Sequence, residues 1–228
     1  MRRFLSLMPF LFPLGFLPAA DPADGFTPLF NGKDFAGWKA FGRAAKDGPT
    51  TPIEAKESWT VADGILAGTG KPTGYLVTDK EYADYILRLK WRYPKDLKAG
   101  NSGVLLHCQK GDAVWPVCVE AQLRSGRAGD IWLQTAAEVK LTVDPSRRDA
   151  SDKTMRHVWR DPKDDDIEKP FGGWNDYEIA CKGGSIALAV NGKRVNEGKE
   201  CNLTEGRIAL QAEGTAIEFK DVVIKSAK

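Results

Sequence analysis

The sequence feature that most restricts the fold is a strict alternation of apolar and polar side chains in two segments. In residues 85–93, YILRLKWRY, aromatic and aliphatic residues take every second position, and Ile86 and three basic residues lie between them. Residues 117–124 alternate in the same way. The polar positions of this second segment are Cys118, Glu120, Gln122 and Arg124. A period of two is that of a β-strand with one packed face, so both segments are predicted strands. The polar row of residues 117–124 is expected to lie on the free face.

Short apolar runs separated by turn residues continue along the chain. The dipeptides Asp63-Gly64 and Asn191-Gly192 are hairpin signals. Further strands are predicted at residues 59–62, 65–66, 75–78, 104–108, 131–134, 139–143, 176–181, 185–190, 193–195, 206–212 and 216–224. The sequence shows no amphipathic helix of useful length, and 228 residues are enough for one large domain. The predicted fold class is all-β, an antiparallel sandwich of two sheets.

The N-terminal residues have the pattern of an export signal. Arg2 and Arg3 precede an apolar stretch at residues 4–17, which is too short for a membrane span. We therefore expect residues 1–20 to be a cleaved signal peptide and residues 21–228 to form a single domain. The expected location is periplasmic or extracellular, with no membrane span after cleavage.

Export makes the four cysteines candidates for disulfides. We expect Cys181 to pair with Cys201 and Cys108 to pair with Cys118. The second pair requires a β-bulge, because simple alternation turns Cys108 away from Cys118. The spacing contains no CxxC motif, which argues against a cysteine metal site.

The balanced charge limits the partners. The chain has 33 basic and 31 acidic residues, for a net charge of +2, and the two signs are interspersed. This distribution argues against a nucleic-acid partner.

Two predicted strand faces could meet in a catalytic site. His107 and Glu120 lie across the predicted hairpin, where they could supply a base or hold a divalent metal ion. Arg88 and Lys90 form a basic row that could oppose Glu120 on the same sheet. The alternatives are a structural role for His107 and a solvated strand face for the basic row. His157, the second histidine, is expected to be solvated.

Residues 144–169 form a charged insertion, which we expect to be a surface loop. Its acidic run, Asp164 to Asp166, could bind calcium or could simply be solvated, and it lacks the alternating spacing of an EF-hand loop.

A set of short motifs, in order along the chain, resembles the 3-keto-disaccharide hydrolase domain family. The motifs are Leu29-Phe30-Asn31-Gly32-Lys33-Asp34 with Gly37-Trp38, Trp59-x-Val61-x-Asp63-Gly64, Asn101-Ser102-Gly103-Val104, Glu120-Ala121-Gln122-Leu123, Gly173-Trp174-Asn175 with Tyr177-Glu178, Gly206-Arg207-Ile208 with Leu210-Gln211, and Ile217-Glu218-Phe219. The resemblance implies a concanavalin A-like jelly roll, similar to that of laminarinases, and cleavage of glycosides oxidised at C3. It also implies that a separate oxidase acts first.

The chain departs from these relatives at three places. Glu213 stands where the family often carries His, and the insertion at residues 144–169 is long. A laminarinase-like catalytic strand carries two carboxylates, whereas the matching strand here keeps only Glu120. Conventional glycoside hydrolysis needs two carboxylates that flank the bond, so this strand alone does not predict it.

Cleavage of a 3-keto glycoside does not need a pair of carboxylates on one strand, because the ketone acidifies the hydrogen on C2. One base removes this proton, a cation or donor holds the enolate, the C1 substituent leaves, and water can add afterwards. Glu120 or His107 is the expected base, and Arg88, Lys90, Arg124 or a metal ion is expected to stabilise the enolate. The candidate substrate-binding residues are Lys90, Asn101, Gln122, Arg124, Trp132, Gln211 and Glu213.

Two other functions stay open. A non-catalytic carbohydrate-binding sandwich would show an aromatic strip in a shallow groove, without a buried set of Glu and His or cations. A structural interaction domain of a cell-surface assembly is the third alternative. The enzyme hypothesis predicts ionisable groups with shifted pKa values gathered in one pocket, around a sugar substrate.

Overall fold

The computed structural model describes residues 24–43, 48–109, 115–135, 138–154, 156–161, 163 and 166–227. The predicted signal peptide lies outside these residues. Within the described residues no helix has the length and apolar character needed to cross a membrane.

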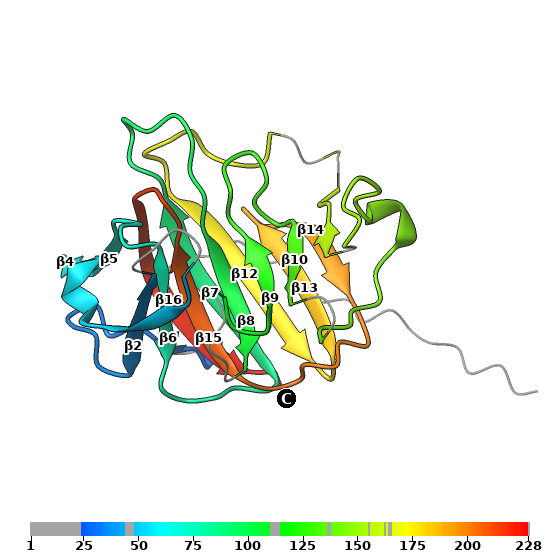
Figure 1. The fold of residues 1–228 in the computed structure, drawn as a ribbon, viewed down its shortest axis with the longest axis horizontal. Coiled ribbons are helices and arrows are strands. Elements are labelled where there is room, and N and C mark those ends of the chain that lie inside the picture. Colours follow the sequence, from blue (N-terminus) through cyan, green and yellow to red (C-terminus); the bar gives the residue numbers. More distant parts are fainter. Residues whose placement is uncertain are drawn as a thin grey trace, which may run out of the picture.

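Two antiparallel sheets of eight strands each lie face to face and enclose the main core (Figure 1). We call the first the back sheet. Its strands are β1 (Thr27–Pro28), β4 (Trp59–Ala62), β5 (Ile65–Gly68), β7 (Tyr85–Arg92), β12 (Asn175–Lys182), β13 (Ser185–Val190), β14 (Lys193–Gly198) and β16 (Ile217–Ser226). Their order is β14-β13-β12-β7-β16-β5-β4, and β1 pairs with β16.

We call the second sheet the groove sheet. In spatial order its strands are β11 (His157–Val158), β10 (Ile131–Gln134), β9 (Cys118–Gln122), β8 (Gly103–Cys108), β15 (Arg207–Ala212), β6 (Gly74–Thr78), β2 (Trp38–Arg43) and β3 (Thr50–Ile53). Two short 3-10 helices, η2 (Ala55–Glu57) and η3 (Pro145–Arg147), lie in connections. The predicted all-β, two-sheet jelly-roll sandwich is therefore confirmed.

Strand β7 shows why the alternating segments specify this architecture. Tyr85, Leu87, Leu89 and Trp91 face the core and are almost completely buried. Between them, the basic side chains face the outer surface of the back sheet and form an ion-pair ladder with β12 and β16. Its pairs are Arg88–Glu178, Lys90–Asp176 and Arg92–Glu218. Cross-strand pairs of opposite charge suit this half-exposed face.

Strand β9 does not have the free face that its alternation predicted. Val119 and Ala121 face the core as expected, but Glu120 and Gln122 on the other face are also buried, at 3% and 7% exposure. Neighbouring side chains, such as Gln134 beside Glu120, leave little of these two residues exposed. Since a sequence pattern reports only which face is apolar, it could not predict a covered polar face.

A β-bulge at the end of β8 decides the orientation of two predicted residues. His107 has a φ angle of +52°, and the pairing with β15 shifts register between Arg207 and Ala209. The extra residue turns His107 toward the core and Cys108 toward Cys118, as the predicted pairing required.

The predicted disulfides are nevertheless absent, since all four cysteines are buried free thiols in the structure. Burial, helped by a hydrogen bond with Cys108, raises the pKa of the Cys118 thiol well above its usual value. Burial likewise raises the pKa of Cys181 to about 12. The thiols of Cys118 and Cys181 therefore stay protonated at neutral pH, whereas disulfide exchange needs the thiolate.

The segment at residues 139–143, predicted to be a strand, is not one. Its only regular pairing within the described residues is a bridge between Thr142 and Lys199. Val139 and Leu141 are buried in the core nonetheless.

Because β7 has one core face and one outer face, substitutions at neighbouring positions should lower the free energy of unfolding by different amounts. We expect Trp91→Ala to lower the free energy of unfolding by about 3–5 kcal/mol, because a fully buried indole that contacts Tyr177 is removed. Lys90→Gln, the matched change one residue away, should cost about 1 kcal/mol or less, since its partly exposed ion pair is screened by solvent. Denaturant unfolding of both variants measures this. Equal losses would contradict the assignment of the two faces.

Candidate active site

A groove of about 790 Å³ lies over the outer face of the groove sheet. The row of side chains at its centre comes from three neighbouring strands in direct register. Glu120 on β9 pairs with Trp132 on β10, and Trp132 pairs with His157 on β11. In register, such side chains stand side by side on one face of the sheet. The other residues that line the groove are Asn101, Trp115, Gln122, Arg124, Ser125, Gly126, Arg127, Asp130, Gln134, Asp149, Arg156, Trp159 and Glu213.

The carboxyl group of Glu120 lies directly over Gly103. A Cβ atom at Gly103 would come within 2.4 Å of Glu120 Oε1, so only glycine leaves space for the carboxyl group. On the other side, Gln134 Nε2 donates a hydrogen bond of 2.5 Å to Glu120 Oε2. The sheet thus holds this carboxyl group in one place.

Burial raises the pKa of Glu120 to about 8. The hydrogen bond from Gln134 opposes this shift, the charge of Glu213 adds to it, and His157 opposes it. At pH 7 most Glu120 is therefore protonated and able to donate a proton.

A second carboxyl group, Glu213, lines the same groove. Asn101 Nδ2 donates a hydrogen bond of 2.8 Å to Glu213 Oε2. Burial also raises the pKa of Glu213, against the attraction of Arg43. A laminarinase-like strand would carry both carboxyl groups. Here β9 supplies only Glu120, and the second carboxyl group of the groove comes from the segment after β15.

His157 is buried between two carboxylates. Its Nδ1 lies 2.9 Å from Asp149 Oδ2 and its Nε2 lies 3.0 Å from Asp130 Oδ2. Both carboxylates are acceptors, so the imidazole donates from both nitrogens and carries a positive charge. Burial lowers its pKa, but the bonds to Asp130 and Asp149 together raise it above the usual value. The expectation of a solvated His157 was wrong.

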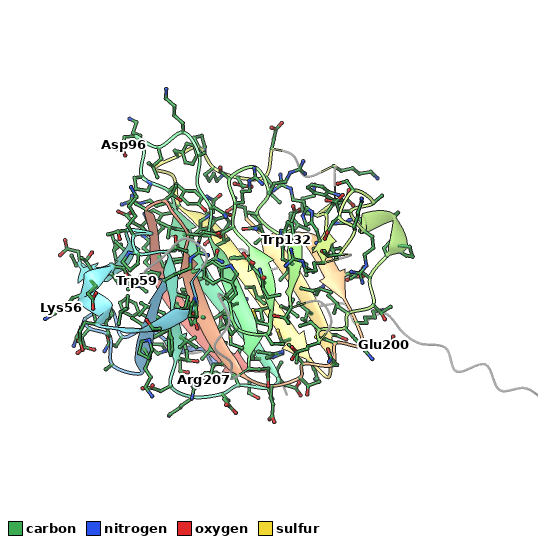
Figure 2. All side chains as sticks on the ribbon, in the orientation of Figure 1. Lys56, Trp59, Asp96, Trp132, Glu200 and Arg207 are labelled. Atoms are coloured by element: carbon green, nitrogen blue, oxygen red, sulfur yellow. The ribbon has the colours of Figure 1, made fainter. Side chains whose placement is uncertain are left out.

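Aromatic rings enclose this imidazolium. The Trp132 indole stacks on it, with ring centroids 4.2 Å apart and planes 10° apart. The ring of Trp159 meets its edge at 3.9 Å. Trp132, which is labelled in Figure 2, lines the groove, as its predicted role in substrate binding requires.

The insertion is not the simple surface loop that the sequence predicted. It contributes β11 as an edge strand of the groove sheet, next to β10. Arg160 anchors it, since this side chain is 1% exposed and its Nη1 donates 3.0 Å hydrogen bonds to Ala128 O and Glu168 Oε1. Asp164 and Asp165 lie outside the described residues, so the predicted calcium site does too.

His107, predicted to be a base or metal ligand beside Glu120, lies elsewhere. The bulge turns its ring toward Tyr85 in the core, with centroids 5.5 Å apart. Its ring nitrogens face the carbonyl oxygens of Leu203 and Ala83, and burial lowers its pKa. The predicted metal pair of His107 and Glu120 is therefore not formed. The described part of the chain contains no group of three or more metal-ligating side chains.

Arg88 and Lys90 are also far from Glu120, because β7 belongs to the back sheet and β9 to the groove sheet. Both side chains form ion pairs on the outer surface of the back sheet. The predicted opposition of the two rows was wrong, since sequence alternation does not tell which sheet a strand joins.

The remaining predicted residues divide into two groups. Asn101, Gln122, Arg124 and Glu213 line the groove. Gln122 Oε1 also accepts hydrogen bonds from the backbone of Leu123 and Arg124. Gln211 is fully buried opposite Tyr75, outside the groove lining, and its amide has no hydrogen-bond partner among the described residues.

Sequence reasoning missed Asp130, Gln134, Asp149, Arg156, His157 and Trp159. Strand β11 has only two residues, which is too short for a periodic signal. The spacing Trp132…His157…Trp159 was visible, but only the pairing of β10 with β11 brings these residues together.

Three comparisons with known proteins show relatives of this chain in sequence and in fold. A curated 3-keto-disaccharide hydrolase from Bacteroides thetaiotaomicron is 26% identical over 191 residues, which cover 77% of this chain. The match covers 59% of that relative's length. A Parabacteroides distasonis protein described as a candidate glycosyl hydrolase has a TM-score of 0.63 at 24% identity, over 91% of this chain and 96% of that one.

The β-glucanase of Bacillus licheniformis shares the fold, with a TM-score of 0.51 at 11% identity over 89% of this chain and 97% of that one. A family model described as the 3-keto-alpha-glucoside-1,2-lyase-like domain matches residues 25–225, nearly the whole described part of the chain. The chain therefore belongs to the 3-keto-alpha-glucoside-1,2-lyase-like domain family.

Proposed function

We propose that the groove cleaves the glycosidic bond of glycosides oxidised at C3, by elimination followed by hydration. The observation that carries this proposal is the protonated carboxyl of Glu120, held beside a second carboxyl, Glu213, in a groove that contains three tryptophans. The family and the hydrolase named among its relatives support the substrate class.

The first step needs a base at C2 and an acid at the leaving oxygen. Glu213 accepts the C2 proton, and Asn101 orients its carboxylate through the 2.8 Å hydrogen bond. Glu120 donates its proton to the aglycone oxygen as the C1–O bond breaks. Its raised pKa therefore changes our sequence-based assignment of Glu120 from base to acid.

The electron pair of the C2–H bond forms the C1=C2 double bond, which is conjugated with the C3 ketone. Negative charge gathers on the C3 oxygen during this step, and we assign Arg124, an exposed cation of the groove, to stabilise it. Water then adds to C1 while C2 regains a proton, so the net reaction is hydrolysis. Glu120 and Glu213 reverse their roles for this half of the reaction.

The tryptophans bind the sugar. Trp132 is held in place by the stacked His157, and Trp115 lines the same groove. Indole faces are suitable surfaces for the apolar face of a pyranose ring. The buried Glu120 and His157, on strands β9 and β11 to either side of β10, favour the enzyme over the binding module, which needs only the aromatic surface.

Export to the periplasm or the cell exterior belongs to this proposal as well. It rests on the apolar N-terminal pattern of the sequence. Mass analysis of the mature protein, with a start after residue 20, tests it.

Elimination removes the hydrogen on C2, whereas direct displacement at C1 leaves it in place. In D₂O we expect a 3-keto-glucoside to release its aglycone and to yield 3-keto-glucose with deuterium at C2, while the unoxidised glucoside stays intact. NMR of the product measures this, with a no-enzyme sample to correct for spontaneous exchange. Aglycone release without deuterium at C2, together with no kinetic isotope effect for a substrate deuterated at C2, would overturn the elimination step. A parallel reaction with chelator tests whether a metal ion takes part.

The acid role of Glu120 predicts the pH profile. Activity depends on the protonated form, so kcat/KM should fall as the pH rises through about 8, and Glu213 should set the acidic limb. Glu120→Gln should lower kcat by about 10²–10⁴-fold and remove the limb near pH 8. Glu197→Gln, the same change on an exposed residue of β14, is the matched control. Full activity in Glu120→Gln would show that another group is the acid.

Gly103→Ala tests the position of the Glu120 carboxyl. The added methyl group would overlap with Glu120 Oε1, so the carboxyl must move and kcat should fall at least tenfold. Gly173→Ala is the control, because the nearest atoms to its added Cβ lie at 3.0 Å and belong to Lys169 and Pro170, which do not line the groove. Unchanged kcat in Gly103→Ala, with the fold intact, would mean that the carboxyl position is not critical.

A further inference from the structure

The acidic groups of the groove are already bonded within the protein. Asp130 accepts from His157 and from the backbone nitrogen of Arg160, which lies 2.7 Å from its Oδ1. Asp149 accepts from His157 and Ser151. Glu213 accepts from Asn101, and Glu120 is largely protonated at pH 7. Asp130 and Asp149 share the single positive charge of His157, and Glu120 is largely protonated at pH 7, so the three arginines of the groove outnumber the negative charges that remain.

Three guanidinium groups line the same groove, and none of them forms an ion pair with a carboxylate among the described residues. Arg124 and Arg127 come from the loop after β9, and both are exposed. Arg156 comes from the insertion and is bonded through Nε to the Thr154 hydroxyl at 2.9 Å.

Two of these arginines are held against ring faces. The guanidinium carbon of Arg127 lies 4.5 Å from the ring centre of Trp159, and that of Arg156 lies 5.8 Å from the ring centre of Trp132. A guanidinium over a ring keeps its N–H donors in its own plane, where they can bind a carboxylate or phosphate in a two-pronged geometry. The rings therefore restrict the positions of these cations but leave most of their donors available.

From this juxtaposition we infer that the groove selects glycosides that carry an oxyanion, such as a carboxylate, sulfate or phosphate group, which Arg127 and Arg156 bind. The inference rests on the proposed function only in taking the ligand to be a glycoside. Since Arg156 and Trp159 belong to the insertion, this selectivity is a property that the insertion adds to the groove.

Binding of an unreactive ligand pair tests the inference separately from catalysis. The pair is 4-carboxyphenyl glucoside and its methyl ester, both unoxidised and used in both anomers, with calorimetry as the measurement. We expect the acid to bind about tenfold to a hundredfold more tightly, the range of one or two charge-assisted hydrogen bonds. This preference should weaken as salt rises, because Arg127 is exposed and Arg156 is only half-buried. Equal affinity for acid and ester would overturn the inference.

Substitutions of the groove arginines test where the oxyanion of the ligand binds. The double change of Arg127→Gln and Arg156→Gln should abolish the preference for the acid while the ester binds as before. Arg127→Lys keeps the charge but not the planar fork, so it should keep only part of the preference. Arg194→Gln, on β14 outside the groove, is the matched control. A preference that survives in the double variant would place the oxyanion elsewhere and overturn the assignment.

Turnover of the corresponding 3-keto-glucosides distinguishes a failure of the proposed cleavage reaction from a failure of the proposed oxyanion site. If the acid binds preferentially but neither keto compound is cleaved, the proposed function fails and the oxyanion site stands. If both are cleaved at equal kcat/KM and bind equally, the proposed function stands and the oxyanion site fails. Sulfated and phosphorylated aryl glucosides in the same assay identify which oxyanion the arginines prefer.

Discussion

The burial of β9 on both faces is the constraint on which the candidate site depends. One face of this strand packs Val119 and Ala121 into the core between the sheets. The opposite face carries Glu120, which lines the groove and is only 3% exposed. A carboxyl group in such a place is costly to ionise, and this cost makes Glu120 an acid at neutral pH. The missing side chain of Gly103 is what makes room for it.

The two histidines differ in charge because their hydrogen-bond partners differ. Both are almost fully buried. His107 faces two carbonyl oxygens in the core, so burial dominates and favours its neutral form. His157 lies between Asp130 and Asp149, whose negative charge outweighs burial and favours the imidazolium. The same side chain is thus an uncharged core residue in one place and a fixed cation of the groove wall in the other.

The insertion gives the groove much of its chemistry. By pairing with β10 it extends the groove sheet by one strand and covers the otherwise open edge of β10. The buried Arg160 and its bond to Glu168 fix this segment against the sheet. In consequence the aromatic and cationic residues of the insertion, His157 and Trp159 among them, stand beside Glu120, although almost forty residues separate them along the chain.

The sequence by itself determined the all-β sandwich, most of its strands and the core face of each, because alternation with period two reports directly which side chains are apolar. It also identified Glu120, Trp132 and Glu213 as candidates. Only the tertiary structure decided which strands share a sheet, and this removed Arg88 from the site and brought His157 into it. Strand order, a one-residue bulge and a two-residue edge strand leave no periodic signal, since they depend on contacts between segments far apart in the chain.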